Sequence, residues 1–152
     1  MSCTSIKQPV VQYTDYVIKS VDIEKTNLNF NFTINNPNVI GLDEALYDYQ
    51  ILINGKEVLA EQNIKFKMPA NLTTNITLPV TIKYISIFNT ASALIEAITR
   101  GDTTMPYEIK ASFRLNFIAF PFTIPFSEKG TLPLPKLTDI KANNLSLDNF
   151  FK

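Results

Sequence analysis

The sequence predicts an all-β fold: an antiparallel, immunoglobulin- or fibronectin type III-like β-sandwich of 7–9 strands with one short α-helix near residues 89–100. Three observations support this prediction. Short segments alternate apolar and polar residues, turn residues separate these segments about every 8–12 positions, and the period changes once to that of a helix. The chain has 152 residues, of which 45% are hydrophobic, so one domain with a sizeable core is expected.

The clearest strand pattern runs from residue 28 to residue 35, where apolar residues alternate with asparagine and threonine. By the same alternation, further strands are expected at Tyr13–Glu24, Ala45–Ile53, Lys56–Ala60, Ile64–Met68, Leu72–Tyr84, Tyr107–Phe117, Phe120–Phe126 and Thr131–Pro135. The lysines of Ile64–Met68 and the proline Pro79 are typical of edge strands. Asn54-Gly55 predicts a tight hairpin, and Glu128-Lys129-Gly130 predicts another turn.

The helical period appears once in the chain. The apolar residues that share one helical face are Ile87, Ala91, Leu94, Ile95 and Ile98. They predict an amphipathic helix over about Asn89–Arg100, with Asn89 as N-cap and Gly101 at the C-terminus. The polar side of this helix is not basic, so the helix is expected to cap the open end of the sandwich rather than to bind a membrane.

Composition excludes most catalytic chemistry. The chain has no histidine, one cysteine and a formal net charge of +0, from 14 basic and 14 acidic residues. Histidine-based catalysis, cysteine-rich metal sites and an electrostatic interface for nucleic acid are therefore not expected. We expect no enzyme activity, catalytic residue, bound metal or cofactor.

Other chemistry-bearing groups have ordinary structural explanations. Asp43-Glu44 is expected in a solvated loop, since calcium would need six or more oxygen ligands. Four further carboxylates are expected as surface charges: Asp15, Asp22, Glu24 and Asp48. An aromatic set is expected in the sandwich core, with an apolar ligand pocket as the alternative: Phe113, Phe117, Phe120, Phe122 and Phe126.

Cys3 has two interpretations. If it follows a lipoprotein cleavage site, Cys3 carries a lipid and residues 1–9 form a tether to the membrane. Otherwise it is a chance cysteine in a cytosolic protein. In either case residues 10–140 are expected to form the domain and residues 141–152 a C-terminal tail. No stretch has the roughly 18 apolar residues of a membrane-spanning helix.

The order of motifs resembles the late embryogenesis abundant group 2 family, also called the water stress and hypersensitive response (WHy) domain. Phe30–Asn35 leads into the turn Asn36-Pro37-Asn38, a strand and hairpin follow at Tyr47–Val58, and Gly130–Pro135 closes the pattern. The resemblance extends from about Val10 to Ile140. One departure is Ala60-Glu61, where the family often has a glycine.

This resemblance implies a β-sandwich protein without catalytic residues that takes part in desiccation and stress tolerance. Its bacterial members are often predicted lipoproteins, so the expected location is the bacterial cell envelope, with the cytoplasm as the alternative. The expected partners are unidentified protein or membrane-surface clients, and the expected state is a monomer or weak dimer. Two other functions stay open: binding a partner protein by strand addition at an edge such as Ile64–Met68, and carrying a small apolar or lipid ligand.

Overall fold

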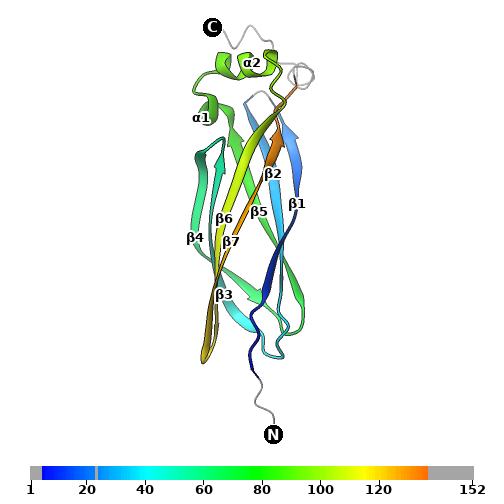
Figure 1. Cartoon of the computed structure of the whole chain (residues 1–152), viewed down its shortest axis with the longest axis vertical. Helices are drawn as coiled ribbons and strands as arrows, with labels where there is room; N and C mark the ends of the chain where they lie inside the picture. The colour runs from blue at the N-terminus through cyan, green and yellow to red at the C-terminus, as the bar shows by residue number, and fades with distance from the viewer. Residues whose placement is uncertain (1–4, 23, 137–152) are drawn as a thin grey trace.

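The computed structural model describes residues 5–22 and 24–136, which form two antiparallel sheets packed face to face (Figure 1). The strands are β1 (Val10–Val21), β2 (Lys25–Asn35), β3 (Leu42–Ile53), β4 (Lys56–Met68), β5 (Thr73–Lys83), β6 (Thr104–Phe117) and β7 (Phe120–Pro133). Sheet A has the order β1-β2-β5, and sheet B has the order β4-β3-β6-β7. The predicted antiparallel β-sandwich is confirmed.

The core lies between the two sheets and follows the alternation in the sequence. β2 and β5 turn every second side chain inward, as their burial patterns show, whereas register shifts interrupt the alternation of β1 and β4. The largest fully buried side chains are Phe30, Phe32, Phe113, Leu28, Ile34, Ile51, Ile53, Met68, Ile82, Leu94, Ile109 and Leu115. Aromatic rings join the sheets: Phe30 of β2 lies 5.0 Å from Tyr107 of β6, measured between ring centroids. Burial of this apolar set is the main force that holds the sheets together.

The helical region differs from the prediction of one helix over residues 89–100. The structure has two helices, α1 (Tyr84–Phe88) and α2 (Ala91–Thr99). Asn89 adopts a positive φ of 66° and ends α1, whereas the Thr90 side chain accepts a hydrogen bond from the Ala93 amide and is the N-cap of α2. The sequence did not predict this break, because apolar residues recur at helical intervals on both sides of it. Ile87 and Leu94 are buried in the core, so the helices do cap one end of the sandwich.

Two predicted interruptions are absent, because β4 and β7 each run as one strand. In β4, the expected strands Lys56–Ala60 and Ile64–Met68 are continuous, with a register shift where Asn63 takes a positive φ. In β7, the predicted turn at Glu128–Gly130 is wrong, since these residues stay paired with β6. Gly130 lies opposite Tyr107, and a Cβ there would come within 2.5 Å of the tyrosine hydroxyl oxygen. Gly130 therefore makes room for the Tyr107 ring on the neighbouring strand and does not mark a turn.

The edge-strand predictions are confirmed, since β4 borders sheet B and β5, which contains Pro79, borders sheet A. The sandwich is long and its two ends differ (Figure 1). One end, here called the helix end, carries α1, α2 and the Asn54-Gly55 hairpin. The other, here called the loop end, carries the N-terminal segment, the β2–β3 loop, the β4–β5 turn and the β6–β7 hairpin.

Candidate functional site

The carboxylates do not form a catalytic or metal-binding constellation in the part of the chain that the structure describes. Residues 5–22 and 24–136 contain no group of three or more acidic, cysteine or histidine side chains able to hold a metal ion. Asp43 and Glu44 are exposed at the start of β3, and Glu44 lies 3.9 Å from Lys65 in a solvated ion pair. Such a pair contributes little to stability.

The four carboxylates predicted as surface charges are divided between the two sheets. Asp15 lies on β1 and accepts a hydrogen bond from the Asn31 amide. Asp22 closes the β1–β2 turn, where its Oδ1 accepts hydrogen bonds from the backbone amides of Glu24 and Lys25. Asp48 lies on β3 of sheet B, 2.9 Å from Nη2 of Arg114. The structure therefore gives Asp15, Asp22 and Asp48 a local structural role, and it places Glu24 at the surface in the β1–β2 turn.

The outer side of sheet A is the first distinctive surface of the molecule. We call it the polar face and define it by the asparagines and threonines that face outward on β2 and β5: Asn27, Asn29, Asn31, Thr33, Asn35, Thr73, Asn75, Thr77 and Thr81. These positions face outward because their neighbours fill the core. The side chains of the polar face are neutral, and each amide or hydroxyl both donates and accepts hydrogen bonds. Lys25, Pro79 and Lys83 also face outward on these strands, and the two lysines lie opposite each other where β2 begins and β5 ends.

Cross-strand hydrogen bonds order part of the polar face. The Asn35 amide donates to the Thr73 hydroxyl at 2.8 Å, and the Thr77 hydroxyl donates to Asn31 Oδ1 at 3.0 Å. The Thr81 hydroxyl donates to Asn27 Oδ1 at 2.7 Å. Such side-chain pairs stabilise the sheet and fix the direction of the outer groups. The result is a regular array of neutral donors and acceptors over two strands.

The Asn36-Pro37-Asn38 turn is the second distinctive feature, and its two asparagines are buried. Asn36 Nδ2 donates to the carbonyl oxygens of Ile40 and Pro69, at 3.0 and 3.1 Å. Asn36 Oδ1 accepts hydrogen bonds from the backbone and side-chain amides of Asn38. One side chain therefore satisfies polar groups of the β2–β3 loop and of the β4–β5 turn.

Asn38 extends this network to the N-terminal segment. Its Nδ2 donates to the Lys7 carbonyl, and its Oδ1 accepts from the Lys7 amide, both at 2.7 Å. This two-bond pairing imitates a strand contact and holds residues 5–9 against the loop end. The turn thus has a structural role here, and the sequence indicated its position but not its partners. Cys3, the expected lipid attachment residue, lies outside the described residues, as does the predicted tail 141–152.

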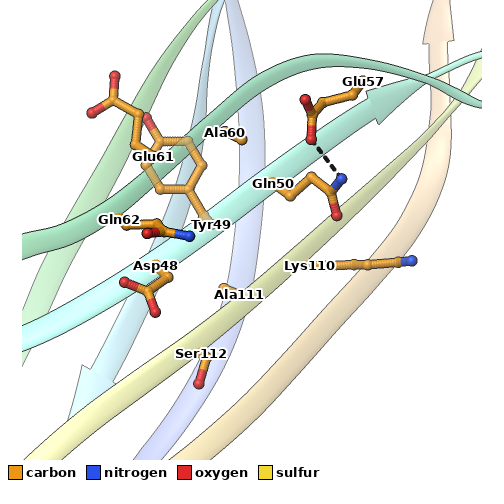
Figure 2. A pocket seen from close by; sticks show the side chains of 10 residues that line it. All are labelled: Asp48, Tyr49, Gln50, Glu57, Ala60, Glu61, Gln62, Lys110, Ala111 and Ser112. Atoms are coloured by element: carbon orange, nitrogen blue, oxygen red, sulfur yellow. Dashed lines mark hydrogen bonds between the residues drawn. The ribbon is translucent and has the colours of Figure 1, made fainter.

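An open hollow of about 410 Å³ lies on the outer side of sheet B (Figure 2). Its lining comes from β3, β4 and β6 and mixes polar side chains with apolar surface: Asp48, Tyr49, Gln50, Glu57, Ala60, Glu61, Gln62, Lys110, Ala111 and Ser112. Within it, the Gln50 amide donates to the Glu57 carboxylate at 2.6 Å. The hollow sits beside the register shift of β4, which explains its position.

The aromatic set belongs mainly to the core, as the sequence predicts. Phe113 and Phe117 are buried, and Phe122 and Phe126 pack against the core from β7. Phe120 is the exception, with 47% of its surface exposed at the β6–β7 hairpin. Because β7 begins at this residue, the ring of Phe120 lies at the tip of the hairpin and is only half covered.

Four tyrosines have raised pKa values, chiefly because burial disfavours the phenolate: Tyr13, Tyr47, Tyr49 and Tyr107. Burial raises the pKa of Tyr49 to about 12, with a smaller effect from Glu61. The hydroxyl oxygens of Tyr107 and Tyr13 lie 3.1 Å apart and share a hydrogen bond, and burial is the main cause of the raised pKa of both tyrosines.

These pKa values predict alkaline unfolding. Above pH 10, tyrosines of the unfolded chain lose protons that the native protein retains, so the free energy of unfolding falls as the pH rises. We expect this loss to begin near pH 10 and to continue through about pH 12. Urea unfolding at a series of pH values would measure it. Tyr49→Phe should make the decline shallower, and an unchanged slope in that variant would contradict the prediction.

Comparison with known proteins agrees with the fold and with the motif order. The family model "Late embryogenesis abundant protein", LEA_2, matches residues 31–130. The protein Lea14-A of Gossypium hirsutum, also a late embryogenesis abundant protein, is 28% identical over 141 residues, which cover 90% of this chain and 88% of that one. MJ1138 of Methanocaldococcus jannaschii is 28% identical over 127 residues, which cover 79% and 67%.

Solved structures show the same fold. AT1g01470 from Arabidopsis thaliana has a TM-score of 0.60 at 23% identity, over 88% of this chain and 86% of that one. The late embryogenesis abundant protein At2g46140.1 has a TM-score of 0.64 at 19% identity, over 88% and 75%. The family model covers most of the sandwich, including the Asn-Pro-Asn turn and the central strands β3 and β6 of sheet B. The chain therefore belongs to the LEA_2 family of late embryogenesis abundant proteins.

Proposed function

We propose that this stress-related protein protects other molecules during loss of water, without catalysis, through the polar face of sheet A. The observation that carries the proposal is the array of neutral amides and hydroxyls over β2 and β5. Groups that both donate and accept hydrogen bonds can replace water at the surface of a client. The protein is folded, so this replacement surface is present before drying begins.

The described part of the structure gives less support to the two other candidate functions. Strand addition needs an accessible edge, and the edge strands here carry prolines, charges or register shifts. These features are Pro79 in β5, Pro121 and Pro125 in β7, and the shifts in β1 and β4. For a carrier, the hollow of Figure 2 is open to solvent and lies outside the sandwich, so it would not enclose an apolar ligand.

A drying assay tests the proposal. A labile enzyme is dried and rehydrated with this protein, or with an unrelated β-sandwich at equal mass. We expect this protein to preserve clearly more activity. Equal preservation by both proteins would overturn the proposal, because the effect would then belong to any folded protein.

A matched pair of variants assigns the effect to the polar face. Asn29→Lys with Asn75→Lys adds two charges to that face at exposed or half-buried positions. Asn116→Lys with Thr131→Lys adds the same charge to exposed positions of β6 and β7 in sheet B. The first variant should lose protection and the second should keep it. Equal behaviour of the two variants would remove the polar face from the mechanism.

We also propose the bacterial cell envelope as the location, through a lipid on Cys3, with the cytoplasm as the alternative. The N-terminal segment leaves the domain at the loop end, beside one end of the polar face, so a lipid there would leave the rest of that face accessible. Intact-mass measurement of the protein from its native host tests this. A mass increase by acyl chains is expected, and an unmodified Cys3 would contradict the proposal. Within residues 5–22 and 24–136, no helix is long and apolar enough to cross a membrane.

A further inference from the structure

Exposed apolar side chains are concentrated at the loop end. Residues 5–22 and 24–136 contain eight large hydrophobic side chains that are exposed. Six of them lie at the loop end: Val10, Val39, Ile40, Leu72, Ile118 and Phe120. The other two, Val17 and Ile85, lie on β1 and α1. Single exposed hydrophobic residues are ordinary on a protein surface, but a concentration at one end indicates an interaction site.

These side chains come from four segments that end at a similar level along the long axis (Figure 1). They are the start of β1, the β2–β3 loop, the β4–β5 turn and the β6–β7 hairpin. The Asn36 and Asn38 network described above ties the first three segments together, so their tips have fixed relative positions. A flat surface perpendicular to the long axis therefore meets all four.

Ile118 carries the strongest single indication. It is 92% exposed and has a positive φ of 47° as the first of two residues in the β6–β7 hairpin. Glycine is the usual residue at such a position, and a β-branched residue there is a clear outlier. The other four non-glycine residues with positive φ in the described structure are all asparagine. An isoleucine that strains the backbone and contacts almost nothing in its own chain indicates a role outside the fold.

Charge at the loop end is nearly balanced, so electrostatic attraction cannot be the main force there. Lys7 and Lys67 are exposed near the tips, and the negative charge of Asp43 partly offsets their positive charge. Glu44 forms an ion pair with Lys65. Binding at this end must therefore come from burial of apolar side chains. It should depend only weakly on salt.

We propose that the loop end docks on a lipid bilayer by inserting these apolar tips into the interface. Separate protruding tips on one plane suit a flat, deformable apolar phase, whereas a protein partner would need a matching pocket for each of them. Two copies meeting end to end would place tip against tip, which buries little surface. This docking goes beyond the proposed protective function and needs no lipid on Cys3.

The chain has no tryptophan, which permits a direct test. Ile118→Trp places a single indole at the hairpin tip, and Ile85→Trp places one at an exposed position on α1, at the helix end. Each variant is mixed with neutral phosphatidylcholine vesicles and with vesicles containing phosphatidylglycerol. We expect a blue shift, and quenching by brominated lipid, for the indole at position 118 on both vesicle types. The indole at position 85 should not respond.

Co-sedimentation with the same vesicles measures the affinity. Ile118→Asn should weaken binding about tenfold, because burying one large aliphatic side chain is worth about that factor. Its melting temperature should stay the same or rise, since asparagine tolerates a positive φ better than isoleucine. Leu72→Ser is a second variant at a separate tip and should weaken binding to a similar extent. Ile85→Asn is the matched control and should bind like the wild type.

Three results would overturn the proposal. One is the absence of vesicle binding by the wild type. Another is binding to anionic vesicles alone that salt abolishes and Ile118→Asn leaves unchanged. The third is a dimer in light scattering that Ile118→Asn dissociates, without vesicle binding, which would assign the loop end to self-association. The drying assay uses no lipid, so failure of this proposal is distinguishable from failure of the protective function.

Discussion

Asn36→Ala is expected to lower the free energy of unfolding by about 3–5 kcal/mol. The substitution removes the donors that satisfy the carbonyls of Ile40 and Pro69, and the acceptor for two amide groups of Asn38. Asn36 is fully buried and Asn38 nearly so, so the Asn38 amides that lose their acceptor are also shielded from water. Each such group costs about 1–3 kcal/mol. Urea denaturation followed by circular dichroism measures the change.

Asn35→Ala is the matched control, one residue earlier in the chain. Asn35 is exposed, and its amide makes one hydrogen bond, to the Thr73 hydroxyl. Its loss should cost about 1 kcal/mol at most, because water replaces the missing partner. Asn36→Asp keeps the shape but replaces donors with an acceptor facing two carbonyls, so it should be at least as damaging as Asn36→Ala. Similar small losses in all three variants would refute the structural role given to the Asn-Pro-Asn turn.

Phe30→Ala should also cost about 3–5 kcal/mol, for a different reason. The Phe30 ring is fully buried at the centre of β2 and lies against the rings of Tyr16 and Tyr107. Truncation leaves a cavity between the two sheets that their paired strands cannot readily close. The loss is a large part of the stability of an ordinary domain, which is about 5–15 kcal/mol. Thermal and urea unfolding of the variant both measure it.

Phe120→Ala is the same substitution at a half-exposed position and serves as the stability control. The ring lies at the hairpin tip, so its loss should cost about 1 kcal/mol or less. Phe30→Leu keeps part of the volume and should fall between the two. If Phe30→Ala and Phe120→Ala were equally stable, the assigned core would be incorrect.

Local pattern was enough to predict much of the fold. Alternation placed Phe30 and Phe32 in the core and the asparagines of β2 outside, and Asn54-Gly55 correctly marked a hairpin. Lysines and Pro79 correctly marked edge strands. These successes share a cause, since each depends on residues close together in the chain.

The errors depend on contacts between distant residues. Gly130 looked like a turn residue, but Tyr107 on the neighbouring strand requires the space that a side chain would fill. The sequence identified Asn36 only as part of a turn. Its side chain also binds Pro69 in the β4–β5 turn, and through Asn38 it is connected to Lys7 in the N-terminal segment. The gathering of exposed apolar side chains at the loop end follows from strand order, which the alternation of single strands does not encode. Sequence reasoning therefore found the polar face and missed the loop end.

The hydrogen bonds of the Asn-Pro-Asn turn have a consequence for folding kinetics. They join segments 31 and 33 residues apart in the chain, at the margin of two sheets that must already be paired to bring them together. We expect contacts of this kind to form after the transition state, so that their loss changes the unfolding rate far more than the folding rate, which the folding and unfolding rates of Asn36→Ala would test. The turn would therefore determine the lifetime of the native state by slowing unfolding, and it would have little influence on the rate of folding.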